Sequence, residues 1–229
     1  MRVDSKLEMR FLVFDFETTG VGTDSSQNYR PHGENLKPLP RANYPVELAA
    51  QIVEFKDGQS MSVEEIPLRL IVKGATRFDP WVEKNCSHLS VQTCDTIGVE
   101  FEELLRLMAK MVNEQTILIS HNIHYDWDMV LKETAKEKGL LNDKNFLTLA
   151  ACRQMCTCVN IGHESEGRAY FYHRIGKWIG PKLSALAERH QVTFDADCAH
   201  NAMYDVNIVC ECLKKMNRDT LSYPKTRLF

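Results

Sequence analysis

Residues 10–20 read RFLVFDFETTG, an apolar run that ends in two carboxylates, two threonines and a glycine. The apolar part, residues 10–16, predicts a strand buried inside a sheet. Residues i and i+2 of a strand point to the same face, so Asp15 and Glu17 are expected to project together from its end. Neighbouring carboxylates repel each other unless a cation or a shared proton relieves them, and hard oxygen ligands select Mg²⁺ or Mn²⁺. Taken alone, the pair fits a solvated strand end equally well.

The rest of the chain predicts an α/β fold. Strands are expected at residues 45–55, 66–72, 116–120 and 146–150, and helices at 99–113, 125–138, 183–190 and 202–216. The first three strands precede any helix, with Asp57-Gly58 as a turn signal, so they are expected to pair as hairpin strands. This order of elements predicts a central mixed sheet of about five strands flanked by helices.

Length and composition are those of one ordinary globular domain. The 229 residues are 44% hydrophobic and 26% charged, with a formal net charge of −3. This charge argues against a wholly basic surface but permits a local basic groove. We find no apolar run long enough for a signal peptide or a membrane span, which predicts a soluble, intracellular protein with mostly free thiols at its eight cysteines. The irregular segments 21–44 and 157–181 are expected to be long loops.

A second polar cluster follows the predicted strand at residues 116–120. It reads His121-Asn122-Ile-His-Tyr125-Asp126 and opens a helix. Asp126 is therefore expected near that helix N-terminus, at the end of a strand next to the first one. A simpler interpretation is an acid favoured by the helix dipole, and it fits the nearby Asp128 better.

A third cluster, residues 200–205, reads HNAMYD at the start of the last helix. Five helical residues leave two side chains about 140° apart, so both ends of the cluster cannot share one helix face. His200 is therefore expected on the loop before the helix, with Asp205 in the second turn. An imidazole with an ordinary pKa near 6.5 can take a proton from water. A lone histidine would not support this role, but one beside the other acidic motifs does.

Together the three clusters resemble the motifs of the DEDDh (DnaQ-like) 3′→5′ exonucleases, the family of the epsilon proofreading subunit of bacterial DNA polymerase III. Residues 15–20 are similar to the first motif, residues 121–126 to the second, and residues 200–205 to the third in its histidine form. The resemblance implies a ribonuclease H-like exonuclease domain over residues 1–217, followed by a tail at 218–229. The long segment after the first motif is more similar to stand-alone, phage-type or viral members.

The resemblance also implies a catalytic mechanism. It assigns the catalytic role to Asp15, Glu17, Asp126, His200 and Asp205. The four acids would hold two divalent ions, which are Mg²⁺ or, as a substitute, Mn²⁺. Asp15 would bridge both ions, and Glu17 and Asp205 would complete the site of the attacking water. Asp126 would hold the second ion, and His200 would deprotonate the water. Two metals about 3.5–4 Å apart can activate water and stabilise the leaving 3′ oxygen.

The expected substrate is the 3′ end of DNA, single-stranded or frayed, cleaved to nucleoside 5′-monophosphates. Thr18, Thr19, His121 and Asn122 are the expected contacts of the terminal nucleotide. A polymerase or other replication protein is a candidate partner, and no membrane is involved. RNA is an alternative substrate, because the contacts with a 2′-hydroxyl that separate RNA from DNA cannot be found in the sequence. A catalytically silent nucleic-acid-binding module is another alternative, but it would lack one of the acids.

Three further segments allow two interpretations each. Residues 168–182 combine basic and aromatic side chains without an acid, which suits single-stranded nucleic acid or a loop packed on the body. Cys152, Cys156, Cys158 and His163 could hold zinc in a zinc-dependent module, but their spacing is not a standard structural pattern and free thiols are favoured. The tail at 218–229 is expected to be a disordered terminus, with docking on a partner as the alternative.

Overall fold

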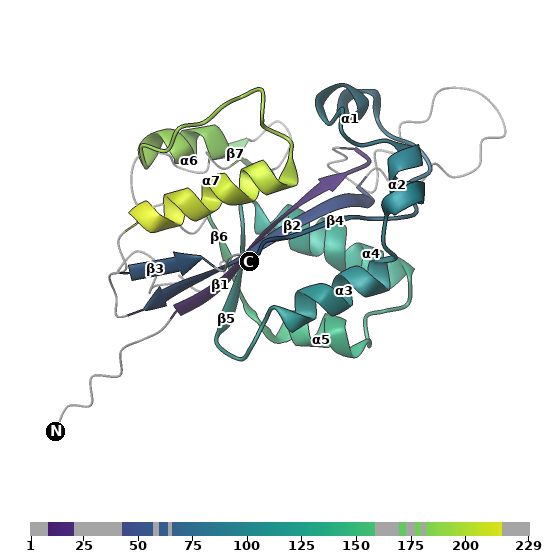
Figure 1. Cartoon of the computed structure of the whole chain (residues 1–229), viewed down its shortest axis with the longest axis horizontal. Helices are drawn as coiled ribbons and strands as arrows, with labels where there is room; N and C mark the ends of the chain where they lie inside the picture. The colour runs from purple at the N-terminus through teal and green to yellow at the C-terminus, as the bar shows by residue number, and fades with distance from the viewer. Residues whose placement is uncertain are drawn as a thin grey trace.

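The computed structural model describes residues 9–20, 43–56, 60–63, 66–158, 170–172, 177–179 and 182–216. Its centre is a mixed sheet with helices packed on both faces (Figure 1). The strands of this sheet are β1 (Met9–Thr18), β2 (Pro45–Lys56), β3 (Ser60–Val63), β4 (Leu68–Ile71), β5 (Thr116–Ser120) and β6 (Arg153–Cys156). Their order is β3-β2-β1-β5-β6, and β4 pairs with β2 on the same edge as β3. The described sheet is therefore five strands wide, as the sequence predicts.

The central strand β1 explains why distant motifs meet. It runs antiparallel to β2 and parallel to β5, and β5 runs parallel to β6. The sheet is thus mixed, which confirms the prediction. Because β1, β5 and β6 point the same way, their carboxyl ends lie at one edge of the sheet. The first motif ends β1 and the second motif follows β5, so both are brought to this edge.

Helices cover the two faces of the sheet. The described helices are α1 (Pro80–Asn85), α2 (Val91–Ile97), α3 (Phe101–Lys110), the π-helix η1 (His124–Lys132), α4 (Glu133–Glu137), α5 (Lys144–Ala151), α6 (Leu183–Arg189) and α7 (Ala202–Lys215). α6 and α7 lie on one face, α3, α4 and α5 lie on the other, and α1 and α2 lie at the end where β1 terminates (Figure 1).

The alternation of β1 separates two apolar cores. Phe11 and Val13 pack with the buried side chains of α6 and α7. Leu12 and Phe14 pack with those of α3, η1 and α5 on the opposite face. Each such buried side chain contributes about 1.5–3 kcal/mol. The next two odd-numbered positions are the carboxylates of the first motif, so the same alternation turns them toward α7.

The prediction of a strand at residues 146–150 is wrong, because these residues lie in α5. The carboxylate of Asp143 caps this helix and accepts hydrogen bonds from the backbone N–H groups of Asn145 (2.8 Å) and Phe146 (3.3 Å). Phe146 and Leu149, three residues apart, are its buried face. A short apolar run fits a helix and a strand equally well, and the cap decides. The last strand of the main sheet is β6, which follows directly.

Other predicted elements are confirmed with changes. The strand expected at 66–72 is β4, but β3 precedes it and was not predicted; the Asp57-Gly58 turn lies outside the described residues. The helix expected at 125–138 is η1 followed by α4, and Gly139, with a left-handed φ of 71°, follows its end as predicted. The helices α1 and α2 were not predicted.

Most of the irregular segments lie outside the described residues. Within 157–181, β7 (Tyr170–Tyr172) and β8 (Lys177–Ile179) pair antiparallel, where a loop was predicted. The predicted nucleic-acid contacts of 168–182 and the tail 218–229 are not covered by the description. Among the described helices, none combines the length and apolar character that a membrane span requires.

Candidate active site

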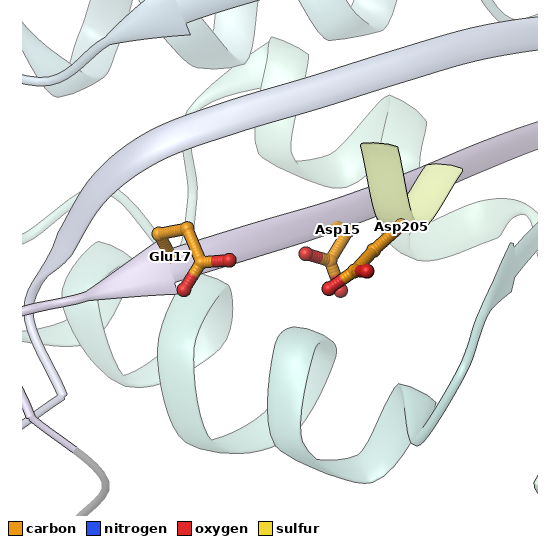
Figure 2. A group of neighbouring side chains, drawn as sticks. All are labelled: Asp15, Glu17 and Asp205. Carbon is orange, nitrogen blue, oxygen red and sulfur yellow. The ribbon is translucent and has the colours of Figure 1, made fainter. Parts of the chain in front are cut away.

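Three carboxylates converge where β1 ends, on the face covered by α7 (Figure 2). One oxygen each from Asp15, Glu17 and Asp205 lie within 4.8 Å of one another. Asp15 and Glu17 extend from β1, as their i, i+2 spacing predicts, and Asp205 reaches them from α7 (Figure 2). The first and third motifs are therefore joined in one cluster.

The start of α7 places the third motif. Asn201 caps this helix, and its side-chain oxygen accepts a hydrogen bond from the backbone N–H of Tyr204 (3.2 Å). His200 stands just before the cap with a left-handed φ of 63°, which confirms its predicted place on the loop. Asp205 lies in the first turn and not in the second as predicted, because helical geometry begins only at Ala202.

Burial and mutual repulsion dominate the electrostatics of the cluster. Burial, with the negative charges of Asp205 and Glu47, raises the pKa of Glu17 to about 8. Burial raises the pKa of Asp205 to about 7, although the backbone N–H of His200 stabilises its carboxylate. Burial and the neighbouring acids also hold the pKa of Asp15 well above its ordinary value. Without a cation, these carboxylates therefore retain protons near neutral pH.

Asp126 stands apart from this cluster. It lies in the first turn of η1 and is almost completely buried. Its carboxylate accepts hydrogen bonds from the backbone N–H of Phe16 (3.2 Å) and from the hydroxyl of Ser120. Burial raises the pKa of Asp126 to about 7 against the effect of these bonds. The helix η1 packs on the face opposite α7, and Asp126 lines the same cavity as the three acids.

Tyr125 ties the second motif to the turn after β1. Its hydroxyl lies 2.8 Å from the hydroxyl oxygen of Thr18 and donates to the carbonyl oxygen of Gly20 (3.1 Å). The hydroxyl of Thr18 donates to the same carbonyl (2.6 Å). Burial raises the pKa of Tyr125 to about 12, so the hydroxyl keeps its proton. Tyr125 belongs to the second motif, but the family resemblance assigns no role to it.

A cavity of about 170 Å³ joins the three motifs. Eight of the nine predicted site residues line it: Asp15, Glu17, Thr18, His121, Asn122, Asp126, His200 and Asp205. Thr19 is the exception. Its backbone N–H donates to the carbonyl oxygen of Tyr44 (2.9 Å), and its hydroxyl accepts from the backbone N–H of Tyr44 (3.2 Å). Thr19 thus connects the end of β1 to the start of β2.

Trp81 is a cavity residue that the sequence interpretation missed. It lines the cavity from α1, and its ring centroid lies 4.8 Å from that of His200 with the ring planes at 81°. Asp79 caps α1 and accepts a hydrogen bond from the backbone N–H of Trp81 (2.8 Å). The dipeptide Asp79-Pro80 is a helix-start signal that could have located this helix.

The cluster fits a divalent metal. Asp205 Oδ1 is buried and has no hydrogen-bond partner among the described residues, so it requires another partner. Clustered carboxylate oxygens are the donor set of Mg²⁺ and Mn²⁺. Within the described ranges, the cluster of three acids is the one set of three or more potential ligands that converges.

The cysteines give a separate result. All eight are free thiols, which confirms the prediction. Cys156 and Cys158 are buried, and their thiols interact with each other. His163, the fourth member of the alternative zinc set, lies outside the described residues, so the alternative of a zinc site is not tested.

Comparison with known proteins identifies the fold. No family model matches the sequence, and no curated protein matches it. Solved structures of exonuclease I do match. The E. coli enzyme in complex with a dT13 oligonucleotide superposes with a TM-score of 0.60 at 14% identity, over 93% of this chain and 42% of that chain. The zinc-bound complex of E. coli exonuclease I with single-stranded DNA gives a TM-score of 0.60 at 15% identity, over 94% of this chain and 42% of that chain.

A third match is exonuclease I from Methylocaldum szegediense, with a TM-score of 0.57 at 16% identity, over 93% of this chain and 42% of that chain. The present chain thus spans less than half the length of these structures. At this identity the likeness concerns the fold. The chain has the ribonuclease H-like exonuclease fold, an α/β fold with a mixed sheet, over nearly its whole length.

Proposed function

We propose that the protein is a metal-dependent 3′→5′ exonuclease acting on single-stranded DNA, releasing nucleoside 5′-monophosphates. One observation carries this proposal: the four acids and the histidine of three distant motifs line a single cavity of about 170 Å³. The shared fold supports it, and both matched E. coli exonuclease I structures named above are complexes with single-stranded DNA or an oligonucleotide.

The acids provide the metal ligands in this proposal. Asp15, Glu17 and Asp205 would hold one divalent ion, with Asp15 shared with a second ion that Asp126 also serves. The separation of Asp126 from the cluster of three acids supports this division. When bound, the ions lower the pKa of water and stabilise charge on the phosphoryl oxygens. Mg²⁺ is the proposed ion, and Mn²⁺ substitutes for it.

His200 is the proposed general base. Its imidazole lines the cavity beside the acids, and burial lowers its pKa. A lowered pKa keeps the imidazole neutral at physiological pH, so one nitrogen is free to accept a proton from water. The backbone N–H of the same residue stabilises the carboxylate of Asp205. His200 would thus serve the metal site with its backbone and the water with its side chain.

Thr18, His121 and Asn122 are the proposed contacts of the terminal nucleotide, since all three line the cavity. His121 is held by its Nδ1, 2.8 Å from the hydroxyl oxygen of Thr157. The contribution of Thr19 is indirect, through its bonds to Tyr44. A polymerase partner, and a place among epsilon-like, phage-type or viral members, stay predictions of the sequence resemblance.

A gel time course tests the function. Oligonucleotides of DNA and RNA, labelled at the 5′ end, would be incubated with Mg²⁺, Mn²⁺ or EDTA. We expect a ladder that shortens from the 3′ end only with metal, faster on DNA, and suppressed by a 3′-phosphate block. Faster degradation of RNA would show that RNA, not DNA, is the preferred substrate. Absence of cleavage by the wild type on both strands would leave a nucleic-acid-binding module as the better account.

A further inference from the structure

One large apolar side chain is exposed at the candidate active site. Trp81 is 40% exposed and lines the cavity with the acids and His200. The other exposed large hydrophobic residues of the described chain, Ile66, Ile97 and Leu147, do not line it. An indole left partly in water beside a polar cavity offers apolar area that a ligand can cover.

The segment that carries Trp81 is anchored to β1 and to the turn that follows it. The backbone N–H of Asp79, just before α1, donates to the carbonyl oxygen of Thr19 (2.7 Å). Val82, next to Trp81, is buried in the apolar cluster under α1 and α2. Further along, the thiol of Cys86 donates to the carboxylate of Glu17 (3.7 Å). These contacts hold α1 at the end of β1, so little ordering is required when a ligand binds.

The chemistry of the cavity determines which ligand part can meet the indole. The carboxylates, with the divalent ions that they would hold, suit the phosphate of a nucleotide and not its base. The base is planar and apolar on its faces, and stacking on tryptophan is favourable for every base. Trp81 lies beside His200 and lines the same cavity as the acids, so a nucleotide with its phosphate at the acids would have its base within reach of the indole.

We propose that Trp81 binds the 3′-terminal nucleobase by stacking, and so makes the enzyme select ends that carry an intact base. This inference rests on the proposed exonuclease function and adds a residue that contacts substrate to that site. Stacking tolerates all four bases, so the selection concerns the presence of a base and not its identity. The contact between Trp81 and His200 allows an alternative role, in which Trp81 only holds the imidazole in place.

A pair of substrates separates these outcomes. One single-stranded DNA oligonucleotide ends in an ordinary 3′ nucleotide, and the other ends in an abasic tetrahydrofuran residue with the same phosphodiester bond. Release of the last residue would be measured as kcat/KM for the wild type, Trp81→Phe and Trp81→Leu. Leu147→Ala is the matched control, because it removes an exposed apolar side chain away from the cavity.

We expect Trp81→Leu to lose about 5- to 150-fold in kcat/KM on the intact end, the range for loss of one stacking contact. On the abasic end it should match the wild type within about twofold. Trp81→Phe should keep most of the activity, and Leu147→Ala should resemble the wild type on both ends. Equal loss by Trp81→Leu on both ends would overturn base stacking, whereas a wild type that cleaves neither end would overturn the exonuclease function itself.

Discussion

Glu17 of β1 lies directly opposite Glu47 of β2 in the antiparallel pair. The two glutamates differ in their partners. The carboxylate of Glu47 is fully buried and is bound by Arg69 Nε (2.6 Å) and His88 Nε2 (3.0 Å), whereas Glu17 faces the acids of the cavity. Glu47 therefore has its partners within the protein, and its neighbour Glu17 remains available to a cation. The negative charge of Glu47 contributes to the raised pKa of Glu17.

The ion pair between Arg69 and the buried carboxylate of Glu47 is expected to stabilise the fold. Arg69→Met would leave the buried carboxylate of Glu47 with His88 alone. It should lower the free energy of unfolding by about 3 kcal/mol, the lower end for a broken buried pair, since Arg69 is itself half exposed. Arg106→Met, which breaks the surface pair with Glu103, is the control and should cost much less, because solvent screens an exposed pair. Urea denaturation measures both, and equal losses would contradict the assignment.

Asp15→Asn is expected to abolish cleavage while stabilising the metal-free protein. The substitution removes one of three crowded carboxylates without changing the shape of the side chain. Thermal unfolding in EDTA at pH 8 should show a Tm higher by a few degrees, as about 1 kcal/mol shifts a protein of this size by about 2–4 °C. Asp95→Asn, on the surface of α2, should change neither property. A lower Tm for Asp15→Asn would mean that the carboxylates do not repel each other.

The stability of the metal-free protein is expected to fall between pH 5 and pH 8. The pKa of Glu17 is raised to about 8, and those of Asp126 and Asp205 to about 7. A raised pKa in the folded state contributes stability that is complete below the unfolded-state pKa near 4 and lost as pH rises through the folded-state value.

Metal should reverse this loss, because it binds the deprotonated carboxylates. Thermal unfolding with Mg²⁺, Mn²⁺ or EDTA would measure the difference at each pH. We expect the metal-dependent rise in Tm to be larger at pH 8 than at pH 5. The same rise at both values would show that protons and metal do not compete for the cluster.

His200→Asn is expected to slow cleavage by about 10²–10⁴-fold, the usual contribution of a general base. Asparagine removes the imidazole but tolerates the left-handed φ of 63° at this position, so the backbone N–H to Asp205 is kept. Metal binding, followed by calorimetry, should stay within about threefold of the wild type. A large loss of metal affinity would assign His200 to the metal site rather than to proton transfer.

Asp126→Ala is expected to remove activity and also to destabilise the protein, unlike Asp15→Asn. It leaves the buried backbone N–H of Phe16 and the hydroxyl of Ser120 without their acceptor, at a cost of about 1–3 kcal/mol. Asp128→Ala, two residues away on the same helix and more exposed, is the control for both properties. If Asp126→Ala cleaves at the wild-type rate, the second motif has no catalytic role.

The local pattern of the sequence determined much of this fold. The alternation in β1 placed Asp15 and Glu17 on one face, and the position of His200 before α7 followed from helical geometry. Local signals were insufficient where two structures suit the same residues. Phe146 belongs to a helix because Asp143 caps it, and an apolar run of that length does not by itself decide between helix and strand.

Within this protein, the sequence by itself determined the candidate site residues, because each lies where a strand ends or a helix begins, and strand and helix geometry can be predicted from local spacing. Only the tertiary structure decided how those motifs meet. The parallel pairing of β1 with β5 brings Asp126 to Phe16, and the packing of α7 on β1 brings Asp205 to Asp15. Trp81 enters the site in the same way, through contacts between segments far apart in the chain. Such contacts depend on the three-dimensional packing of apolar faces, which no local spacing records.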